Sequence, residues 1–272
     1  MIDVERKVGR EVVGFKMDIQ IKSKTELENT YLIKDISPAY ANALRRFSMD
    51  FVPTLAIEDV EIKMNSSALY DEVLAHRIGL IPLTTDLKSY VLPEGEEITA
   101  MNSVVLTLSK EGPSTVLSSD FKTKDPKVKP AFDEIQVVKL IEDQSIELTA
   151  TAVMGQGRVH AKWSPCNTYY SYEPEIKVNN KSSKLKDFID KFPPQVVHDG
   201  KIDEKAITNS MLIDACDGVC DDIVSIKYNN NNFLFTIESF GQLTPEEIFG
   251  ETLVQFNKEL DTLKELVKEI KN

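Results

Sequence analysis

The sequence predicts an α+β fold with more than one domain, and three observations support this prediction. Apolar and polar residues alternate over the stretches 56–64, 104–108, 135–140 and 146–152, as is typical of half-buried strands. Amphipathic helices are predicted after Ser37 and at the C-terminus, where apolar residues recur every three or four positions. The chain of 272 residues is long enough for two domains or more.

Shorter strands are predicted on both sides of this strand-rich region. Residues 16–21 and 30–33 should form two strands ahead of the helix that follows Ser37. The asparagine run at 229–232 is interpreted as a polar turn, and residues 233–237 as the strand after it. Helices and strands are therefore expected to be mixed along the chain, without an internal repeat of fixed period.

The first predicted helix begins at a clear N-terminal signal, with Ser37 as the N-cap and Pro38 in the first helical position. Its apolar face consists of Tyr40, Ala43, Leu44, Phe47 and Phe51. Asn42, Arg45 and Arg46 project from the opposite side, where they can donate several hydrogen bonds to carboxylates or carbonyls of a partner. From spacing alone, a solvated charged face is the simpler interpretation.

A second short helix is predicted over residues 70–78, with Gly79 placed to end it and residues 80–83 continuing as a short buried strand. His76 and Arg77 lie near its end. No nucleophile or pair of carboxylates stands out near them in the sequence, and a lone histidine at a helix end is more often a structural hydrogen-bonding group than a general base. We therefore predict contact rather than catalysis for His76.

The C-terminal helix is the longest predicted element. Thr244, Pro245 and Glu247 form a capping box, and the helix should continue to about Ile270, roughly 39 Å at 1.5 Å per residue. Its apolar stripe consists of Ile248, Phe256, Leu260, Leu263, Val267 and Ile270. Such a stripe can pack on its own domain, but a helix of this length usually extends beyond a small core. The protruding part then needs a partner.

Composition excludes several classes of function. The formal net charge of −12 argues against broad, sequence-independent binding to nucleic acid, and the short basic stretches at 122–129 and 181–186 are interpreted as solvated loops. No apolar run approaches the roughly 20 residues of a membrane span. The first residues lack the apolar segment of a signal peptide, so we expect a cytoplasmic protein. Walker, HExxH and GxSxG motifs are absent from the sequence.

Four segments of the chain resemble the family of the archaeal RNA polymerase D subunit, which includes the third-largest subunit of the eukaryotic enzymes and is related to the bacterial alpha subunit. These segments are residues 42–46, 71–83, 159–165 and 235–241. The resemblance covers nearly the whole chain except a weak region between about residues 174 and 226. It implies a non-catalytic subunit of DNA-directed RNA polymerase, a nucleotidyltransferase whose magnesium-binding aspartates lie in another chain.

The resemblance also implies the partners and the residues that bind them. The chain would form a heterodimer with the smaller subunit L and nucleate assembly of the two large catalytic subunits, without binding DNA sequences itself. The residues implied to face a large subunit are Asn42, Arg45, Arg46, His76 and Arg77. Those implied to face subunit L are Phe256, Leu260, Leu263 and Val267.

The implied architecture is an α+β dimerisation domain interrupted by a mostly β insert domain and by a degenerate ferredoxin-like insert. Residues 1–52, 163–178 and 228–272 would form the dimerisation domain, and the last of these segments contains the long C-terminal helix. Residues 53–162 would form the β-rich insert domain. The ferredoxin-like insert would span residues 179–227.

Many members of this family carry an iron–sulfur cluster in the second insert, held by the spacing C-x2-C-x2-C-x3-C followed by proline. In this chain only Cys216 and Cys220 keep the last spacing. Ser210 and Ile213 stand at the first two positions, and Asp221 replaces the proline. We therefore predict no cofactor, and expect the insert to be held by Leu185, Phe188, Ile189, Phe192, Leu212 and Ile223.

The three cysteines leave some alternatives open. A three-iron cluster that recruits the distant Cys166 is one of them, whereas zinc is disfavoured because the sequence has no CxxC and its three histidines are scattered. An odd number of cysteines in a long chain does not indicate a disulfide framework. The competing functions are an iron–sulfur or metal-dependent redox protein and a free-standing protein-binding adaptor.

Overall fold

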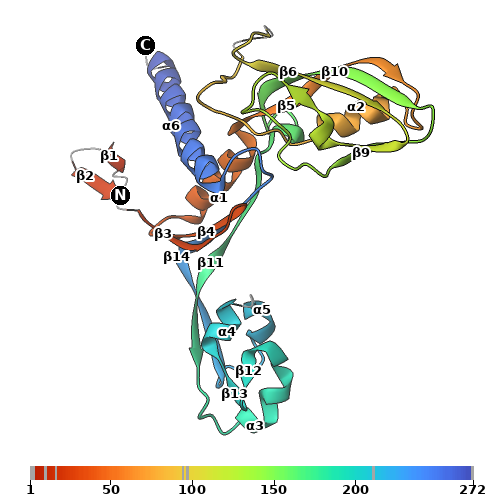
Figure 1. The fold of residues 1–272 in the computed structure, drawn as a ribbon. Helices are drawn as coiled ribbons and strands as arrows, with labels where there is room; N and C mark the ends of the chain where they lie inside the picture. Colours follow the sequence, from red (N-terminus) through yellow and green to blue (C-terminus); the bar gives the residue numbers. More distant parts are fainter. Residues whose placement is uncertain are drawn as a thin grey trace. The chain divides into compact units, whose positions relative to one another are not determined.

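The computed structural model describes residues 4–8, 11–15, 17–93, 95, 98–209 and 212–270. It has the mixed α+β architecture predicted from the sequence, with mostly antiparallel sheets (Figure 1). The chain divides into two compact units. The first comprises Met1–Gln20, Leu32–Pro38 and Ser171–Leu234, and the second comprises Ile21–Tyr31, Ala39–Tyr170 and Phe235–Asn272.

A four-stranded sheet has the order β11-β14-β4-β3. Its strands are β3 (Asp18–Lys24), β4 (Glu28–Lys34), β11 (Cys166–Val178) and β14 (Val224–Ser239). Strands β3 and β4 confirm the two strands predicted before the first helix. The predicted polar turn at residues 229–232 is wrong, because β14 continues through these asparagines without interruption.

Neighbouring polar groups explain why the asparagine run is extended. Within the first unit, the backbone N–H of Ile36 donates to the carbonyl of Asn231 at 3.0 Å, and Asn232 Nδ2 donates to Glu173 Oε2 at 2.7 Å. These bonds satisfy polar groups that an isolated run of asparagines would otherwise satisfy in a turn. Long-range pairing therefore overrides the local turn preference.

Two helices in the second unit begin at the predicted signals. Helix α1 spans Pro38–Asp50, and α6 spans Pro245–Ile270 with 26 residues. The predicted capping box is confirmed, because Thr244 N–H donates to Glu247 Oε2 at 2.9 Å and Glu247 N–H donates to Thr244 Oγ1 at 3.3 Å. Just before it, Gly241 adopts a φ of 91°, and a Cβ there would lie 2.8 Å from that of Ala131. Only glycine suits this turn.

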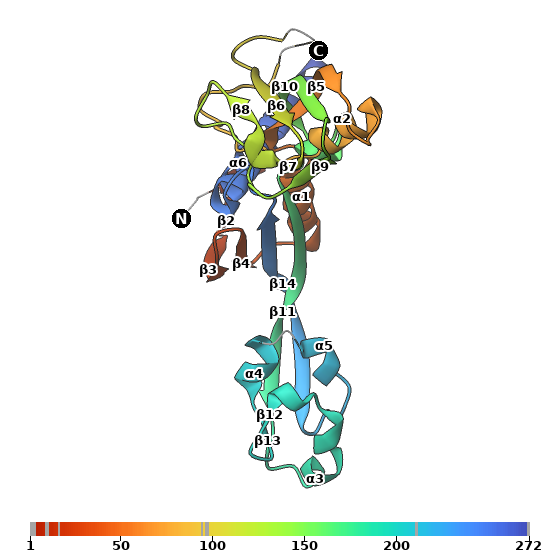
Figure 2. The same cartoon turned by 45° about the vertical axis from the view of Figure 1, so that its right-hand side comes forward.

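Within the second unit, a larger core forms around a second sheet with the order β5-β10-β6-β8 (Figure 2). Its elements are β5 (Pro53–Asn65), β6 (Ser103–Glu111), β8 (Lys122–Thr123) and β10 (Ser145–Gln156), with α2 (Asp71–Gly79) packed on β5. Strands β7 (Ser114–Leu117) and β9 (Gln136–Leu140) form a separate antiparallel pair. The core includes Leu55, Leu74, Leu106 and Leu148.

The strand predicted at residues 80–83 is wrong. Ile81 and Leu83 are buried as expected, but Leu80 is 50% exposed and the segment makes only an isolated bridge between Leu83 and Pro130. The apolar run therefore reflects burial under the sheet rather than strand pairing. Short apolar runs do not distinguish these two cases by periodicity.

The first unit contains a smaller set of elements. These are the hairpin β1 (Val4–Val8) and β2 (Glu11–Phe15), the pair β12 (Val197–His198) and β13 (Lys201–Ile202), and the helices α3 (Leu185–Phe188), α4 (Glu204–Asn209) and α5 (Ile213–Cys216). Single 3₁₀ turns occur at Ile189–Lys191 and Pro194–Val196 in this unit, and at Ser118–Asp120 and Ala161–Trp163 in the second unit. No helix in the described part of the chain is both long and apolar enough to cross a membrane.

Candidate partner-binding surfaces

The C-terminal half of α6 exposes an apolar surface. All residues from 257 to 270 are exposed. The large apolar side chains among them form what we call the C-terminal stripe: Leu260, Leu263, Leu266, Val267 and Ile270. Leu266 was absent from the predicted apolar stripe, and Ile270 was in that stripe but not among the predicted partner-binding residues, although Leu266 lies three positions after Leu263 and Ile270 three after Val267. Spacing would have added both.

Phe256 differs from the three other predicted contacts of α6. Its ring is half-buried and packs edge-on against Tyr40 and Phe47 of α1, with ring centroids 5.6 and 4.9 Å apart. Farther toward the helix start, Phe249 is buried and stacks on Tyr31 of β4 at 4.8 Å. The intramolecular packing of this face therefore reaches Phe256 and stops there.

On α1, the buried side chains are Ala41, Leu44 and Ser48, whereas the predicted polar residues Asn42 and Arg45 are half-buried at the edge of that face. Arg45 donates from Nε and Nη2 to the side-chain oxygen of Asn42, at 3.2 and 3.1 Å, so the two residues form one preorganised group. Arg46 is exposed. Within the described residues neither arginine forms an ion pair, so both positive charges remain available to an anionic partner.

On α2, His76 is exposed, whereas Arg77 forms hydrogen bonds within the chain. Arg77 Nε donates to the carbonyl of Val137 at 2.9 Å, and Nη2 donates to that of Gln136 at 2.7 Å. Arg77 thereby holds α2 against β9. Sequence reasoning missed the exposed apolar side chains of Tyr70, Val73 and Leu80, which recur at helical spacing beside these two residues.

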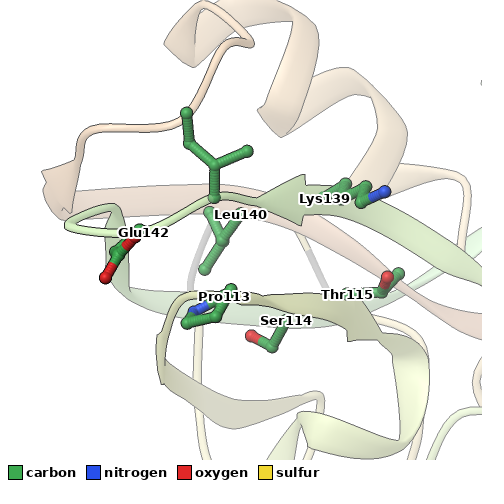
Figure 3. A pocket seen from close by; sticks show the side chains of 7 residues that line it. Pro113, Ser114, Thr115, Lys139, Leu140 and Glu142 are labelled. Carbon is green, nitrogen blue, oxygen red and sulfur yellow. The ribbon is translucent and has the colours of Figure 1, made fainter.

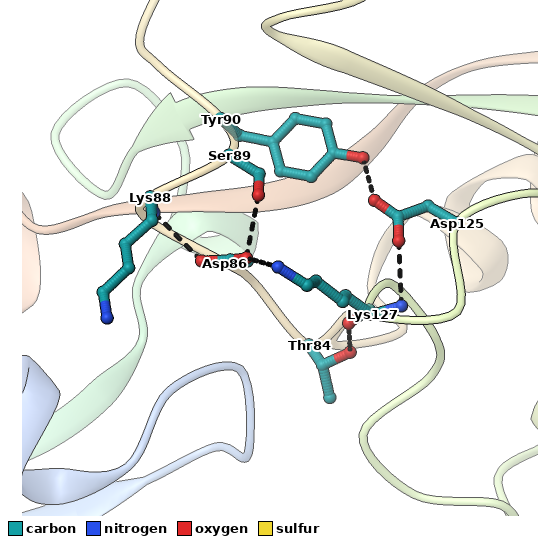
Figure 4. A network of polar contacts seen from close by, with 7 residues as sticks. All are labelled: Thr84, Asp86, Lys88, Ser89, Tyr90, Asp125 and Lys127. Atoms are coloured by element: carbon teal, nitrogen blue, oxygen red, sulfur yellow. Dashed lines mark hydrogen bonds and ion pairs between the residues drawn. The ribbon is translucent and has the colours of Figure 1, made fainter.

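A polar network joins two loops of the second unit (Figure 4). Lys127 Nζ lies 2.5 Å from Asp86 Oδ2, and Tyr90 donates its hydroxyl proton to Asp125 at 2.5 Å. Burial and the hydrogen bond to Asp125 raise the pKa of Tyr90 to about 12. Hydrogen bonding from Lys127 lowers the pKa of Asp86. Because each charge and hydroxyl has a partner within the network, these groups serve structure rather than proton transfer.

A shallow hollow of about 500 Å³ is lined by residues at one end of the β7–β9 pair (Figure 3). Its lining consists of Pro113, Ser114, Thr115, Lys139, Leu140, Ile141 and Glu142. The two hydroxyl groups in this set have no histidine among the lining residues to activate them. The hollow does not have the composition of a hydrolytic site.

Two of the three free cysteines, Cys166 and Cys216, are buried, and Cys220 is half-buried. Cys166 lies in β11, where its thiol is 3.4 Å from the carbonyl oxygen of Ser48 and 3.2 Å from Thr168 Oγ1, and burial raises its pKa to about 11. Cys216 and Cys220 belong to the first unit, whereas Cys166 belongs to the second. Among the described residues, no three His, Cys, Asp or Glu side chains are grouped to hold a metal ion. Ser210 lies outside the described residues.

Comparisons with known proteins identify a consistent set of relatives. A family model described as the RNA polymerase Rpb3/RpoA insert domain matches residues 60–167. The chain is 33% identical over 263 residues to DNA-directed RNA polymerase subunit Rpo3 of Methanobrevibacter smithii, with 90% of this chain and 96% of the relative covered. Subunit Rpo3 of Methanothermobacter thermautotrophicus is 37% identical over 242 residues, with coverage of 85% and 92%.

The corresponding subunit of Archaeoglobus fulgidus is 34% identical over 265 residues, and the match covers 93% of this chain and 98% of the relative. All three relatives carry the same name, and their matches extend over nearly their full length. They give no support to a redox enzyme or a free-standing adaptor.

Proposed function

The chain belongs to the Rpo3 family of archaeal DNA-directed RNA polymerase subunits, and on this premise we propose that it is a non-catalytic platform for polymerase assembly. It would take part in transcription in the cytoplasm as one subunit of a nucleotidyltransferase whose active site lies in another chain. The observation that carries this proposal is the C-terminal stripe, a continuous apolar surface at the exposed end of a 26-residue helix.

The stripe is the proposed binding surface for the smaller subunit L. Leu260, Leu263 and Val267 are 38, 56 and 41% exposed, and burying such side chains against a partner contributes about 1.5–3 kcal/mol for each one fully buried. Phe256 would fix the position of the start of this surface, because its ring packs on Tyr40 and Phe47 of α1. A helix face of this kind suits a partner that presents its own apolar face.

The proposed contacts with a large subunit lie on α1 and α2. On α1, Asn42 orients Arg45 while Arg46 projects freely, so the pair offers a planar donor group and a second cation to carboxylates. On α2, we propose that His76 makes contact directly, beside the exposed Tyr70 and Val73. Arg77 also holds α2 in position, because its Nε and Nη2 donate to carbonyls of β9.

We further propose the domain boundaries given by the resemblance, with a dimerisation domain at 1–52, 163–178 and 228–272. The β-rich insert at 53–162 contains most of the matched family segment and the larger core. Residues 179–227 would form the second insert, of ferredoxin-like origin. Neither insert would carry a catalytic residue.

The decisive experiment is co-expression of the chain with subunit L, followed by size-exclusion chromatography. The wild-type chain should elute as a one-to-one heterodimer, whereas the double variant Leu260→Glu, Leu263→Glu should lose most of the heterodimer peak. Glu265→Lys, on the opposite side of the same exposed segment, is the control for a change of charge and should pair normally. An unchanged heterodimer in the double variant would refute the proposed surface.

A further inference from the structure

The second insert contains a contiguous apolar core that includes a cysteine. The buried members of this small core are Phe192, Val196, Ile202, Ile207, Cys216, Ile223 and Val224. Cys216 is 0% exposed, and Cys220 is half-buried and packs against the same core. Of the six predicted packing residues, Phe192 and Ile223 are in the core, and Leu185, Phe188 and Leu212 pack against it. Ile189 is half-buried but does not belong to this set.

The surroundings of Cys216 do not suit an iron–sulfur ligand. Ile213, which stands where the ferredoxin spacing has a cysteine, packs against the small core with its hydrocarbon side chain. Burial raises the pKa of the Cys216 thiol and so favours the protonated form, whereas cluster ligands are thiolates. Cys166 cannot complete the set without leaving its own contacts with Ser48 and Thr168 in the other unit.

A module of this size needs an internal source of stability. Small domains usually depend on a metal or disulfides when their apolar core is insufficient. Here side chains from residues 176 to 226 converge on one core, and both cysteines contribute apolar surface to it. A free buried cysteine behaves as a small hydrophobic residue.

We infer that the second insert folds around this apolar core without an iron–sulfur cluster, and that Cys216 and Cys220 are packing residues in it. The insert is then insensitive to iron supply, chelators and oxygen. This inference does not depend on the proposed assembly function, because it rests only on the packing of side chains within the insert.

The first test measures iron and acid-labile sulfide in the full-length chain, purified with subunit L under anaerobic conditions from iron-supplemented cells. We expect far less than one iron per chain. Three or four irons per chain with matching sulfide would overturn the inference, whatever the assembly experiment shows.

The second test separates packing from ligation by comparing substitutions at one position. If Cys216 is a packing residue, both variants should lower the thermal midpoint, and Cys216→Ser should lower it about 2–4 °C more than Cys216→Ala does. The reason is that serine buries a hydroxyl group among apolar side chains. Cys220→Ser, at a half-buried position, should be nearly silent. If both residues were ligands, alanine and serine at 216 and serine at 220 would cause equal losses, and a chelator would destabilise only the wild type. That pattern would refute the packing role.

Discussion

The two halves of α6 carry the same kind of apolar stripe and use it differently. In the first half, Ile248, Phe249 and Thr252 are buried, and Phe249 stacks on Tyr31. In the second half, Leu260, Leu263 and Val267 continue the three- and four-residue steps of that face, yet all are exposed. Phe256 marks the boundary, because its ring still packs on Tyr40 and Phe47.

This difference shows that an amphipathic pattern reports an interface without saying which chain supplies the other side. The first half finds its partner within the same chain, and it contributes to folding. The second half continues the apolar stripe but lies beyond the last aromatic contact, so its apolar area contributes to stability only when another surface covers it. Substitutions in the two halves should therefore be measured by different experiments.

The largest expected effect is on folding and concerns the first half. Phe249→Ala should lower the free energy of unfolding by about 3–5 kcal/mol, because it removes a buried ring that stacks on Tyr31 and leaves a cavity. Leu263→Ala, the matched change in the second half, should alter it by less than about 0.5 kcal/mol. Urea unfolding of the chain without its partner measures both. Equal losses would mean that the second half is buried within the chain after all.

Much of this arrangement could be predicted from the sequence because the signals are local. Ser37 and Pro38 mark the start of α1, and the pairing of Thr244 with Glu247 marks the start of α6, since each signal involves residues within one helical turn. The stripe is predictable for the same reason. Its periodicity lies within one helix.

The features that sequence reasoning missed depend on residues far apart in the chain. Arg77 bonds to carbonyls about 60 positions away, and Phe256 packs on a helix near the other end of the sequence. The asparagines of β14 are extended because partners such as Glu173 receive their hydrogen bonds. No local pattern contains these partners, so the sequence predicted a turn where the chain forms a strand, and it gave no sign that Arg77 also bonds to β9.

The arginines of α1 and α2 allow the same comparison for polar side chains. Arg45 is proposed to bind another subunit, whereas Arg77 forms hydrogen bonds within the chain. Arg45→Ala should leave the heterodimer with subunit L intact but weaken binding of a large subunit by about 2–5 kcal/mol if its ion pair is buried there. Reconstitution of the larger complex from purified subunits measures this loss. Loss of the heterodimer itself would show that α1 presents the opposite face.

Arg77→Ala should act on folding instead. It removes two hydrogen bonds to backbone carbonyls, each contributing about 0.5–1.5 kcal/mol, so the free energy of unfolding should fall by about 1–3 kcal/mol. Arg46→Ala, at an exposed position, is the control and should change it little. Urea unfolding compares the two. A stable Arg77 variant with impaired assembly would instead make Arg77 a direct contact.

Phe256→Ala tests the boundary between the two halves. Its two edge-to-face contacts with Tyr40 and Phe47 are worth about 0.5–1.5 kcal/mol each, so the variant should be moderately less stable. It should also weaken pairing with subunit L, because the base of the C-terminal stripe loses its support. Unfolding and titration with subunit L should therefore both respond. A change in only one of them would place the boundary on one side of Phe256.

The smallest expected effect on stability comes from the exposed ion pair between Asp86 and Lys127. Hydrogen bonding from Lys127, then from the backbone of Lys88 and the hydroxyl of Ser89, lowers the pKa of Asp86 in the folded chain. Its contribution to stability is therefore present above the unfolded pKa, near 3.9, and is lost as the pH falls below that value. Asp86→Asn keeps an acceptor for Lys88 and Ser89 but removes the charge.

At pH 7 this variant should shift the thermal midpoint by less than about 4 °C, because the side chain of Lys127 is 62% exposed and the pair is screened by solvent. As the pH falls below about 4, the wild type should progressively lose its advantage while the variant follows a flatter curve. The loss should continue below about pH 3, because hydrogen bonding holds the folded pKa of Asp86 well below its usual value. Thermal unfolding across this range measures the difference. Parallel curves down to pH 3 would show that Asp86 is not stabilised in its ionised form. An exposed ion pair, like the exposed half of α6, would then contribute nothing to folding on its own.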